Sequence, residues 1–464
     1  MRLFWHRRDL RVRDNRGLAT AAADGPVVSV FVRDTDLLDR LGDRQRAFFL
    51  RGVRRLRESY RDLGSDLIVR EGRPSDVLPE LAEEFGAEAV VYNEHYRPER
   101  RDRQNEVDAA CADAGLATAG ETDLVLVDPA RLDERYPNHG RFRDAWQAVP
   151  KEPLAPAPDA EDLASPDGVD PGTVPEEPTA DIELPAAGYR AARERYDDFL
   201  ANGIDSYRAS RDDLARAVEA PTLAVSRMSP YLAAGMIGVR EVWADASERR
   251  EAATGEECDQ VWKYLDELTW REQQYHLLYC DPDLPTKNYK SIPNEIEWRD
   301  DADEFDAWKR GETGYPLVDA GMRQLREEGY VHNRPRQVVA SFLTKHLLVD
   351  WRKGRRHFAE QLVDHDPASN AGNWQWIAST GIDSVDVRIF DPVAQASKYD
   401  DEARFVKAYV PELRDVPAGE VVDWPTLPPD ERERLAPEYP DPIVDRDAAY
   451  ERAQRVFERA LGKR

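Results

Sequence analysis

The sequence predicts an α/β N-terminal domain with a parallel sheet, followed by an all-α C-terminal domain. In the first third of the chain, short runs rich in β-branched residues alternate with helical patterns, which is typical of parallel α/β domains. After Gly188 the strand patterns end and apolar residues recur at helical spacing. With 464 residues, the chain is long enough for two or three domains with separate cores.

The N-terminal domain is expected to hold a Rossmann-like sheet with strands at Arg2–His6, Val27–Arg33, Asp66–Arg70, Ala89–Asn93 and Asp123–Val127. Helices are expected near Arg44–Leu63, Pro74–Phe85 and Pro98–Ala114. The first strand is followed by the polar loop His6–Arg11 instead of a G-x-G-x-x-G turn. A nicotinamide-dinucleotide site is therefore not expected.

A segment rich in Pro, Asp, Glu and Ala, about Lys151–Pro185, carries almost no aromatic residues and predicts an irregular linker that packs no core. We therefore expect an α/β domain over 1–130, a linker over 131–187 and a helical domain over 188–464. Apolar periodicity in the last part predicts helices at Ala191–Ala201, Pro230–Ala246, Gln260–Tyr279, Leu317–Glu328, Pro335–Val349 and His357–Val363.

The formal net charge of −26 argues, taken alone, against a nucleic-acid partner, because DNA affinity comes largely from neutralised phosphates. An acidic excess is also typical of a protein adapted to high salt, in which case the local balance decides. Between Arg323 and Arg356, nine basic residues face three acidic ones. This stretch indicates either a DNA-binding surface or a solvated helix face.

The cellular compartment follows from cysteine usage and hydropathy. Cys111, Cys258 and Cys280 are far apart, which favours buried free thiols in a reducing cytoplasm over a disulfide or zinc framework. The sequence has no run of eighteen apolar residues, and Met1 leads directly into the first strand. We expect a cytoplasmic protein without a signal peptide or a membrane span.

Two motifs favour a bound nucleotide. In Ser226-Arg227-Met228-Ser229-Pro230, Ser229 is expected to cap a helix that has Pro230 at its first position, and such helix starts bind anions. Ordinary capping also explains this motif. On the helix around Trp270, four residues spaced i, i+3, i+4 and i+7 share one polar and aromatic face, which suits a nucleobase better than a core: Glu267, Trp270, Arg271 and Gln274.

Further polar groups follow in the helical domain. In His332–Gln337 the amides of Asn333 and Gln337 lie four residues apart near a helix start, and amides recognise base edges well. The segment Asp364–Trp376 carries carboxylates, asparagines and tryptophans. Metal ligation is set aside there because the spacings of calcium loops and zinc sites are missing, so a polar cradle for an organic cofactor is favoured and no metal is expected.

Together, several motifs occur in one order over nearly the whole chain: Phe4–Arg11, Glu267–Glu272, Gly314–Ala320, Asn370–Trp376 and Pro411–Pro417. In these motifs the chain resembles the photolyase/cryptochrome family. The resemblance implies an α/β antenna domain, a long linker and a helical domain that holds a non-covalent FAD. It implies these cofactor-binding residues: Tyr207, Ser226, Arg227, Met228 and Ser229 at the phosphates, and Arg336, Asp364, Asp366 and Asn370 at the flavin ring.

The resemblance also implies an activity. Photolyases are carbon–carbon lyases that use blue light and reduced flavin to split cyclobutane pyrimidine dimers in DNA. By similarity, Glu267 and Asn333 act at the lesion, and Trp374, Trp351 and Trp298 conduct electrons from the surface to the flavin. The implied DNA-contacting set is Arg211, Glu267, Trp270, Gln274, Asn333, Arg334, Gln337 and Trp376.

The chain departs from the usual dimer-repair pattern at Gln337, where methionine is typical, and at Ser369–Asn373. Both changes resemble DASH cryptochromes, whereas Trp376 resembles repair enzymes. Photolyase is the first interpretation, and a DASH-like light sensor or single-strand photolyase is the second. A flavin electron-transfer protein without a DNA partner is the third, and the basic stretch disfavours it.

The family resemblance leaves the second chromophore open. Glu99 lies in a segment that resembles a folate-binding one, so the antenna pigment is methenyltetrahydrofolate or 8-hydroxy-5-deazaflavin if one is present. We expect no obligate protein partner and a monomer.

Overall fold

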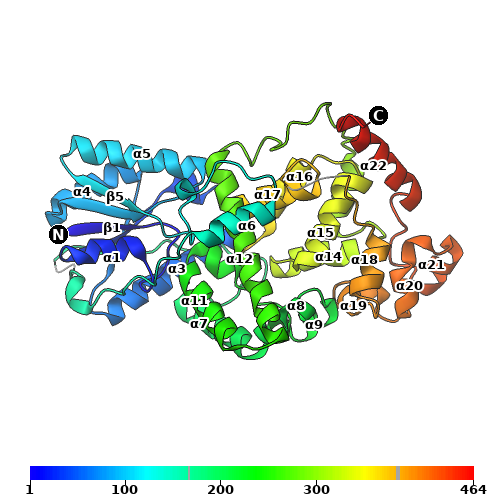
Figure 1. The fold of residues 1–464 in the computed structure, drawn as a ribbon, viewed down its shortest axis with the longest axis horizontal. Helices are drawn as coiled ribbons and strands as arrows, with labels where there is room; N and C mark the ends of the chain where they lie inside the picture. Colours follow the sequence, from blue (N-terminus) through cyan, green and yellow to red (C-terminus); the bar gives the residue numbers. More distant parts are fainter. Residues whose placement is uncertain (166–167, 383–386, 464) are drawn as a thin grey trace.

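A computed structural model of the chain describes residues 1–165, 168–382 and 387–463 (Figure 1). Its N-terminal part is a five-stranded sheet in the order β3-β2-β1-β4-β5, and every neighbouring pair is parallel. The strands are β1 Arg2–His6, β2 Val27–Arg33, β3 Leu67–Glu71, β4 Ala89–Asn93 and β5 Ala117–Glu121. The predicted fold class, a parallel α/β domain followed by helices, is confirmed.

Helices cover both faces of the sheet because side chains alternate along each strand. In β1, Phe4 belongs to the core beneath α1 (Arg16–Ala23) and α3 (Asp43–Asp62). Its neighbours Leu3 and Trp5 belong to the core beneath α4 (Pro74–Phe85) and α5 (Pro98–Asp113). The chain therefore buries the strand on both sides, as a doubly covered parallel sheet requires.

The fifth predicted strand was wrong. Strand β5 lies at Ala117–Glu121, and the apolar run Asp123–Val127 leaves the sheet. The backbone N–H groups of Leu126 and Val127 donate to the Glu272 carboxylate, at 2.8 and 3.3 Å. The run is apolar because it packs against the helical domain.

The segment before the helical domain also differs from its prediction. It contains α6 (His139–Ala148), and Leu163, Val174 and Leu184 are buried in it, so it contributes to the core although its composition is polar. Its acidic residues bind arginines of α3: Asp181 accepts from Arg44 at 2.7 Å. The domain boundaries at 130 and 187 stay predictions.

The remaining described chain is helical: α7 Tyr189–Asn202, α8 Tyr207–Ser210, α9 Leu214–Glu219, α10 Ser229–Ala234, α11 Val239–Ala252, α12 Glu256–Cys280, α13 Ala302–Arg310, α14 Pro316–Glu328, α15 Asn333–Ser341, α16 Trp351–Gln361, α17 Pro367–Ile377, α18 Pro392–Tyr399, α19 Arg404–Tyr409, α20 Ala418–Val422, α21 Pro429–Leu435 and α22 Arg446–Ala460. Helix α15 continues into a π-helix, Phe342–His346. Helix α16 begins six residues before the predicted start because Asp350 caps it, accepting from Arg352 N at 2.9 Å.

One predicted helix, Pro230–Ala246, is two helices separated at Gly235. Gly235 has φ 67°, and a Cβ there would lie 2.0 Å from the Arg8 carbonyl oxygen. Only glycine accepts this close approach in a left-handed conformation. The break lets the N-terminal loop touch the helical domain.

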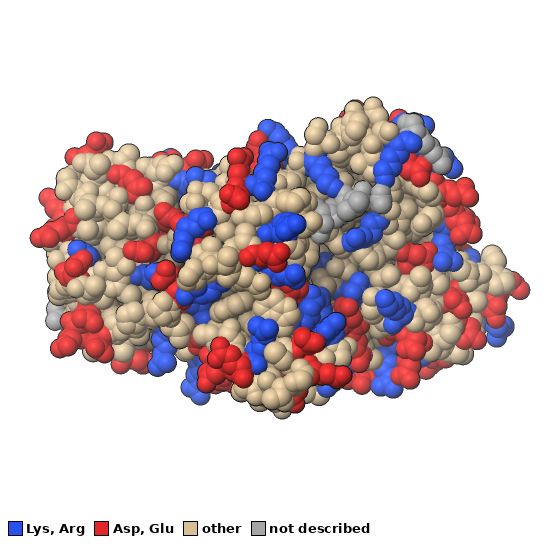
Figure 2. Space-filling model, viewed as in Figure 1, with Lys and Arg blue, Asp and Glu red and all other residues tan. Residues whose placement is uncertain are grey.

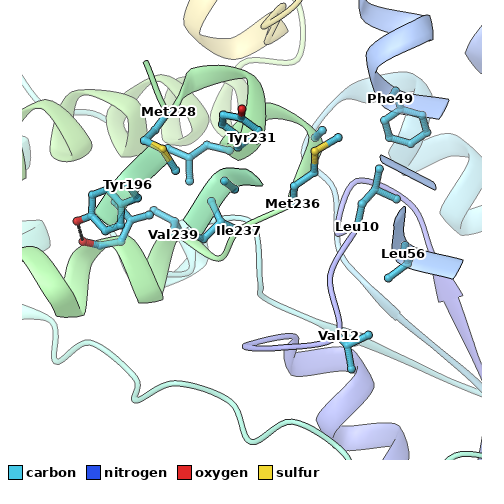
Figure 3. Close-up of a cluster of buried hydrophobic side chains, with 14 of the residues drawn as sticks. Leu10, Val12, Phe49, Leu56, Tyr196, Met228, Tyr231, Met236, Ile237 and Val239 are labelled. Atoms are coloured by element: carbon cyan, nitrogen blue, oxygen red, sulfur yellow. Dashed lines mark hydrogen bonds between the residues drawn. The ribbon is translucent and has the colours of Figure 1, made fainter. Parts of the chain in front are cut away.

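One large hydrophobic cluster contains residues of both domains (Figure 3). Leu10 and Phe49 from the α/β domain lie beside Met236 at the start of the connection between α10 and α11. A buried ionic network borders this cluster: Arg240 pairs with Asp14 and Asp123, and Asp123 pairs with Arg11. The domains therefore share one core and one set of buried charges.

Candidate functional site

A cavity of about 330 Å³ lies between α12, α15 and α17. The four residues predicted to share one face of α12 all line it, as do Asn333 and Gln337 of α15 and Trp376 of α17. The complete lining is Arg211, Lys263, Glu267, Trp270, Arg271, Gln274, Asn333, Gln337, Ser369, Asn373, Trp376 and Ile382. Residues separated by more than a hundred positions thus face one space.

The Glu267 carboxylate lies between two cations at the wall of this cavity. It accepts a hydrogen bond from the Arg211 guanidinium, and Lys263 Nζ lies 2.7 Å from its Oε1. Burial lowers the pKa of Arg211, but the charge of Glu267 more than offsets this and the pKa is raised. Arg211 therefore stays charged beside Glu267, whose carboxylate lines the cavity and can accept a hydrogen bond from a ligand there.

The Arg334 side chain contacts Gln337, one of the residues that line the cavity. Its Nη1 donates to Gln337 Oε1 at 2.8 Å, its Nη2 donates to Asp212 at 2.7 Å, and its guanidinium lies 4.2 Å from the Tyr399 ring centroid. Arg334 itself does not line the cavity. Asn333, the first residue of α15, is exposed, while His332 caps the helix.

The predicted flavin-ring residues include an ion pair with unused hydrogen-bonding capacity. Arg336 Nη2 lies 3.6 Å from Asp364 Oδ1. Arg336 Nε and Asp364 Oδ1 are both buried without a hydrogen-bond partner, and Asp364 is only 7% exposed. Buried polar atoms without partners are costly unless a ligand satisfies them. A donor and an acceptor of this kind fit the hydrogen-bonding edge of a flavin.

Asn370 and Asp366 have protein partners already. Asn370 Nδ2 donates to the Arg355 carbonyl at 3.0 Å, which leaves its amide oxygen as the free end. Asp366 caps α17 through Ser369 N at 2.9 Å, and it also binds the Tyr275 hydroxyl and Arg8. Burial raises the pKa of Asp366, but Arg8 and the two hydrogen bonds hold it below its usual value. Asp366 therefore connects the start of α17 to Arg8 of the α/β domain.

The predicted phosphate end differs in detail from its prediction. Helix α10 begins at Ser229, its cap position is Met228, and Ser229 makes no capping bond, so the cap lies one residue earlier than expected. Arg227, at φ 50°, donates to Glu328 Oε2 at 2.7 Å instead of pointing at a free anion site. Ser229 is exposed, whereas the half-buried Ser226 hydrogen-bonds the Tyr264 side chain. Tyr207 is buried, and the Arg211 guanidinium lies 5.7 Å from its ring centroid.

The two tryptophans of α17 face different surroundings, as their spacing predicts. Trp374 is buried in the core of the helical domain, edge-on to Phe358 at 5.2 Å and to Trp308 at 6.3 Å between ring centroids. Trp376 lines the cavity, with the Arg388 guanidinium 4.4 Å from its ring centroid.

Trp351 and Trp298, the other two tryptophans predicted to conduct electrons to the flavin, differ in their exposure to solvent. Trp351 is fully buried and its Nε1 donates to Asn288 Oδ1 at 3.0 Å. Trp298 is half-buried, with its ring 6.0 Å from that of Phe457 on α22.

Two family models match the chain: one described as DNA photolyase over residues 2–161, and one described as the FAD binding domain of DNA photolyase over residues 264–459. A deoxyribodipyrimidine photo-lyase of Halobacterium salinarum is 45% identical over 487 aligned residues, covering 100% of both chains. The chain belongs to the DNA photolyase family.

Solved photolyase structures share the fold. A class III photolyase from Agrobacterium tumefaciens has a TM-score of 0.87 and 34% identity, covering 100% of this chain and 98% of that one. An archaeal photolyase from Sulfolobus tokodaii, solved with two FAD molecules, has a TM-score of 0.82 and 30% identity, covering 99% of each chain.

Within this photolyase fold, one part of the basic stretch was predicted wrongly. Arg323 is 7% exposed and binds the Gly311 carbonyl and Glu412, and Lys345 is fully buried against Ser379 and Phe457. Both side chains are buried inside the protein, so neither is available to contact DNA. Figure 2 shows Lys and Arg side chains gathered along the middle of the face in view, while Asp and Glu dominate its left end.

The sequence did not single out a group of arginines in the photolyase-type α/β domain. Arg7, Arg8 and Arg100 are at most 8% exposed, and each has a buried guanidinium nitrogen without a hydrogen-bond partner. Burial lowers the pKa of Arg100, and the neighbouring arginines lower it further. Arg7 and Arg100 line a small cavity of about 30 Å³ whose apolar walls include Trp5, Phe31 and Phe49.

The predictions about cysteines, membrane spans and metal sites can be compared with the structure. The three cysteines are free thiols, but only Cys111 is buried and the other two are partly exposed. No helix in the described part of the chain is long and apolar enough to cross a membrane. Among residues 1–165, 168–382 and 387–463, no three His, Cys, Asp or Glu side chains gather as a metal ion would need.

Proposed function

We propose that this photolyase-family chain is a deoxyribodipyrimidine photo-lyase, an enzyme that splits cyclobutane pyrimidine dimers in DNA under blue light. The observation that carries the proposal is the cavity between α12, α15 and α17. It combines a carboxylate, two indole rings and four amides, which is what an extruded pair of pyrimidines requires. Full-length relatives with this activity in their names support it.

The cavity residues bind and orient the lesion. Trp270 and Trp376 supply flat apolar surfaces on which the two joined bases pack. Glu267, which lies between Arg211 and Lys263, accepts a hydrogen bond from a base N–H. Asn333 and Gln337 offer amides to base edges. Arg334 and Arg356, the exposed arginine of α16, contact phosphates beside the lesion.

FAD is the cofactor, and the described residues fit it. Arg336 Nε and Asp364 Oδ1, which have no hydrogen-bond partner in the protein, hold the edge of the ring, and Asn370 offers its amide oxygen. The exposed Ser229 offers its hydroxyl to the phosphates, and Ser226, which also hydrogen-bonds Tyr264, and Tyr207 lie at the same end of the cofactor. Reduced FAD, when bound, supplies the light-excited electron that splits the dimer. Trp374, Trp351 and Trp298 line the route from the cofactor region to the surface.

A second chromophore belongs at the arginines of the α/β domain. The unpartnered guanidinium nitrogens of Arg7 and Arg100 suit an anionic group, and the nearby aromatic walls suit a flat ring. The closed cavity of about 30 Å³ does not hold such a ring, so Leu37 and Leu38 at its wall have to move. Methenyltetrahydrofolate and 8-hydroxy-5-deazaflavin both stay open, and a chromatogram of the extracted pigments separates them.

The second candidate function is a DASH-like light sensor or single-strand photolyase. Gln337, held by Arg334 at 2.8 Å, favours it, because a polar side chain stands where typical repair enzymes carry methionine.

We further propose a cytoplasmic monomer. The free cysteines and the few exposed large apolar residues, Met1, Leu154 and Tyr450 in the described chain, support this.

The deciding experiment measures loss of thymine dimers. Purified protein with fully reduced FAD is illuminated with blue light in the presence of dimer-containing single-stranded and double-stranded oligonucleotides. A photo-lyase removes dimers from the single strand at least, and a dark control removes none. Loss in neither substrate would replace the repair proposal with the light sensor.

A further inference from the structure

His139 and Trp270 form a face-to-face ring stack. Their centroids are 3.6 Å apart and their planes differ by 8°. Trp270 lines the proposed lesion cavity, whereas His139 does not, so the imidazole covers the indole face that is turned away from the cavity. His139 is only 5% exposed. One side of Trp270 is therefore permanently occupied by another flat ring.

Three polar contacts hold the imidazole in its plane. His139 Nδ1 lies 2.8 Å from Gln273 Oε1, and Nε2 lies 3.3 Å from Thr269 Oγ1 and 3.7 Å from Asp266 Oδ1. The Thr269 hydroxyl donates to the Asp266 carbonyl at 2.8 Å, which leaves its lone pairs toward the imidazole. All these partners belong to α12, the helix that carries Trp270. The same helix therefore presents the indole and fixes the ring behind it.

Helix α6 brings His139 to this position. Asn138 caps α6 by accepting from Arg141 N at 3.0 Å, and His139 is the first residue of the helix. Phe142 and Trp146, further along α6, are fully buried and anchor it. Figure 1 shows α6 lying across α12 in the middle of the molecule. A segment between the two predicted domains thus supplies the ring behind Trp270, although no residue of α6 lines the cavity itself.

We propose that His139 is a positioning residue for lesion recognition. It backs the Trp270 ring so that the opposite face stays aligned with an extruded base, and the three rings form one stack. The inference rests on the proposed function, because it takes Trp270 as a surface for the lesion. Without the imidazole behind it, the indole can rotate about its side-chain bonds. Binding of the lesion then has to restrict this rotation, and the entropy lost weakens the affinity for the lesion.

Three variants distinguish a role of His139 in positioning the Trp270 ring from a role in the stability of the fold. His139→Leu removes the flat ring, whereas His139→Phe keeps a flat ring and loses the hydrogen bonds. Arg143→Gln is the matched control, because Arg143 lies on the same helix and binds Asp266 at 3.2 Å without touching the stack. The dissociation constants for dimer-containing and undamaged single-stranded oligonucleotides are measured for each holoenzyme, together with FAD content and the thermal midpoint.

His139→Leu is expected to weaken binding of the lesion about 2- to 10-fold, the range typical of one aromatic pair. Binding of undamaged DNA, FAD content and the repair yield at saturating lesion stay at wild-type values, since neither the phosphate contacts nor the cofactor site changes. His139→Phe and Arg143→Gln bind the lesion within about twofold of wild type. A purely structural role would lower FAD content and binding of both oligonucleotides together, and would overturn the proposal.

A double-mutant cycle closes the test. In a Trp270→Ala background, His139→Leu is expected to have no further effect on lesion binding, because the ring that it positions is gone. An undiminished effect in that background, equal lesion binding by His139→Leu and wild type, or a Phe variant as weak as the Leu variant would each overturn the proposal. Wild-type repair in the same preparations shows whether the proposed function holds, so the two failures are distinguishable.

Discussion

Trp374 and Trp376 lie two residues apart on α17 and face opposite sides of the helix: Trp374 is buried against Phe358 and Trp308, and Trp376 lines the lesion cavity. We propose that this short segment serves two tasks, electron transfer toward the cofactor through Trp374 and contact with the substrate through Trp376. Because the tasks reside on separate rings, mutations separate them.

Replacing Trp374 with Phe is expected to abolish light-driven reduction of oxidised FAD while leaving FAD bound. Phenylalanine fills most of the buried site, so the fold is kept, but its ring is much harder to oxidise than an indole and does not pass the electron on. Absorbance of the illuminated protein at the flavin band measures it. The control is Trp424→Phe, another fully buried tryptophan in the same core. Photoreduction at the wild-type rate in Trp374→Phe would remove this residue from the relay.

The reciprocal change is Trp376→Ala. Loss of one stacking ring is expected to weaken binding of the dimer by about 1–3 kcal/mol, while FAD photoreduction proceeds as in wild type. Fluorescence anisotropy with a labelled dimer-containing strand measures the affinity. If photoreduction slowed and affinity did not change, the assignments of the two rings would be reversed.

DNA binding is expected to weaken as salt rises. Arg356 is exposed on α16, and Arg356→Gln should lower the slope of log K against log salt by about one unit if the guanidinium contacts a phosphate. Arg190→Gln is the control, because Arg190 is exposed on α7 and pairs with Glu194. A slope that Arg356→Gln leaves unchanged would show that this arginine belongs to a solvated helix face.

Asp319 gives a pH-dependent contribution to stability. Burial raises its pKa to about 6, although Thr313 and Tyr439 hydrogen-bond it. Below about pH 4 the carboxyl is neutral in the folded and unfolded chains, and between about pH 4 and 6 only the unfolded chain ionises it. Its contribution is therefore present at low pH and lost as pH rises through 6, by about 3 kcal/mol over that interval.

The measurement is the free energy of unfolding of wild type and Asp319→Asn by urea at pH 4.5 and 7. The difference between the two proteins is expected to be larger at pH 4.5. A difference independent of pH would mean that Asp319 titrates at its ordinary value in the fold. Taking the difference removes the contribution of the other carboxylates, which titrate in both proteins.

Local spacing in the sequence predicted most of the cavity. The face of Glu267, Trp270 and Gln274 follows from helical geometry alone, and the structure brings it to one cavity. His139 lies more than a hundred residues away, and no local pattern connects it to Trp270. Its role depends on how α6 packs on α12, which periodicity does not specify.

Errors in the prediction have a common physical origin. The run Asp123–Val127 has the composition of a strand, but an apolar run indicates burial and not the partner that buries it. Arg323 and Lys345 were counted as surface charge, yet the fold buries both with partners. The break at Gly235 depends on the approach of Arg8, a residue of the other domain. In each case a tertiary contact overrides the local pattern.

We propose that Gln337 decides between repair of duplex DNA and repair of single strands only. Its Oε1 accepts from Arg334 at 2.8 Å while its side chain lines the cavity, so it is held as a polar group at the entrance. Methionine at this position would offer a soft apolar surface to the displaced bases and would release Arg334 from one hydrogen bond. Extruding a dimer from a duplex costs a few kcal/mol and costs much less in a single strand.

Gln337→Met is therefore expected to raise repair of double-stranded substrate several-fold and to leave single-strand repair nearly unchanged, because the substitution assists extrusion and does not touch the cofactor site. Dimer loss per absorbed photon, measured on both substrates with fully reduced FAD, gives the two values. Gln395→Met, on α18 outside the cavity lining, is the matched control and should change neither. Equal gains on both substrates would place Gln337 in the chemical step, and equal losses would make its hydrogen bond to Arg334 a requirement for holding the dimer.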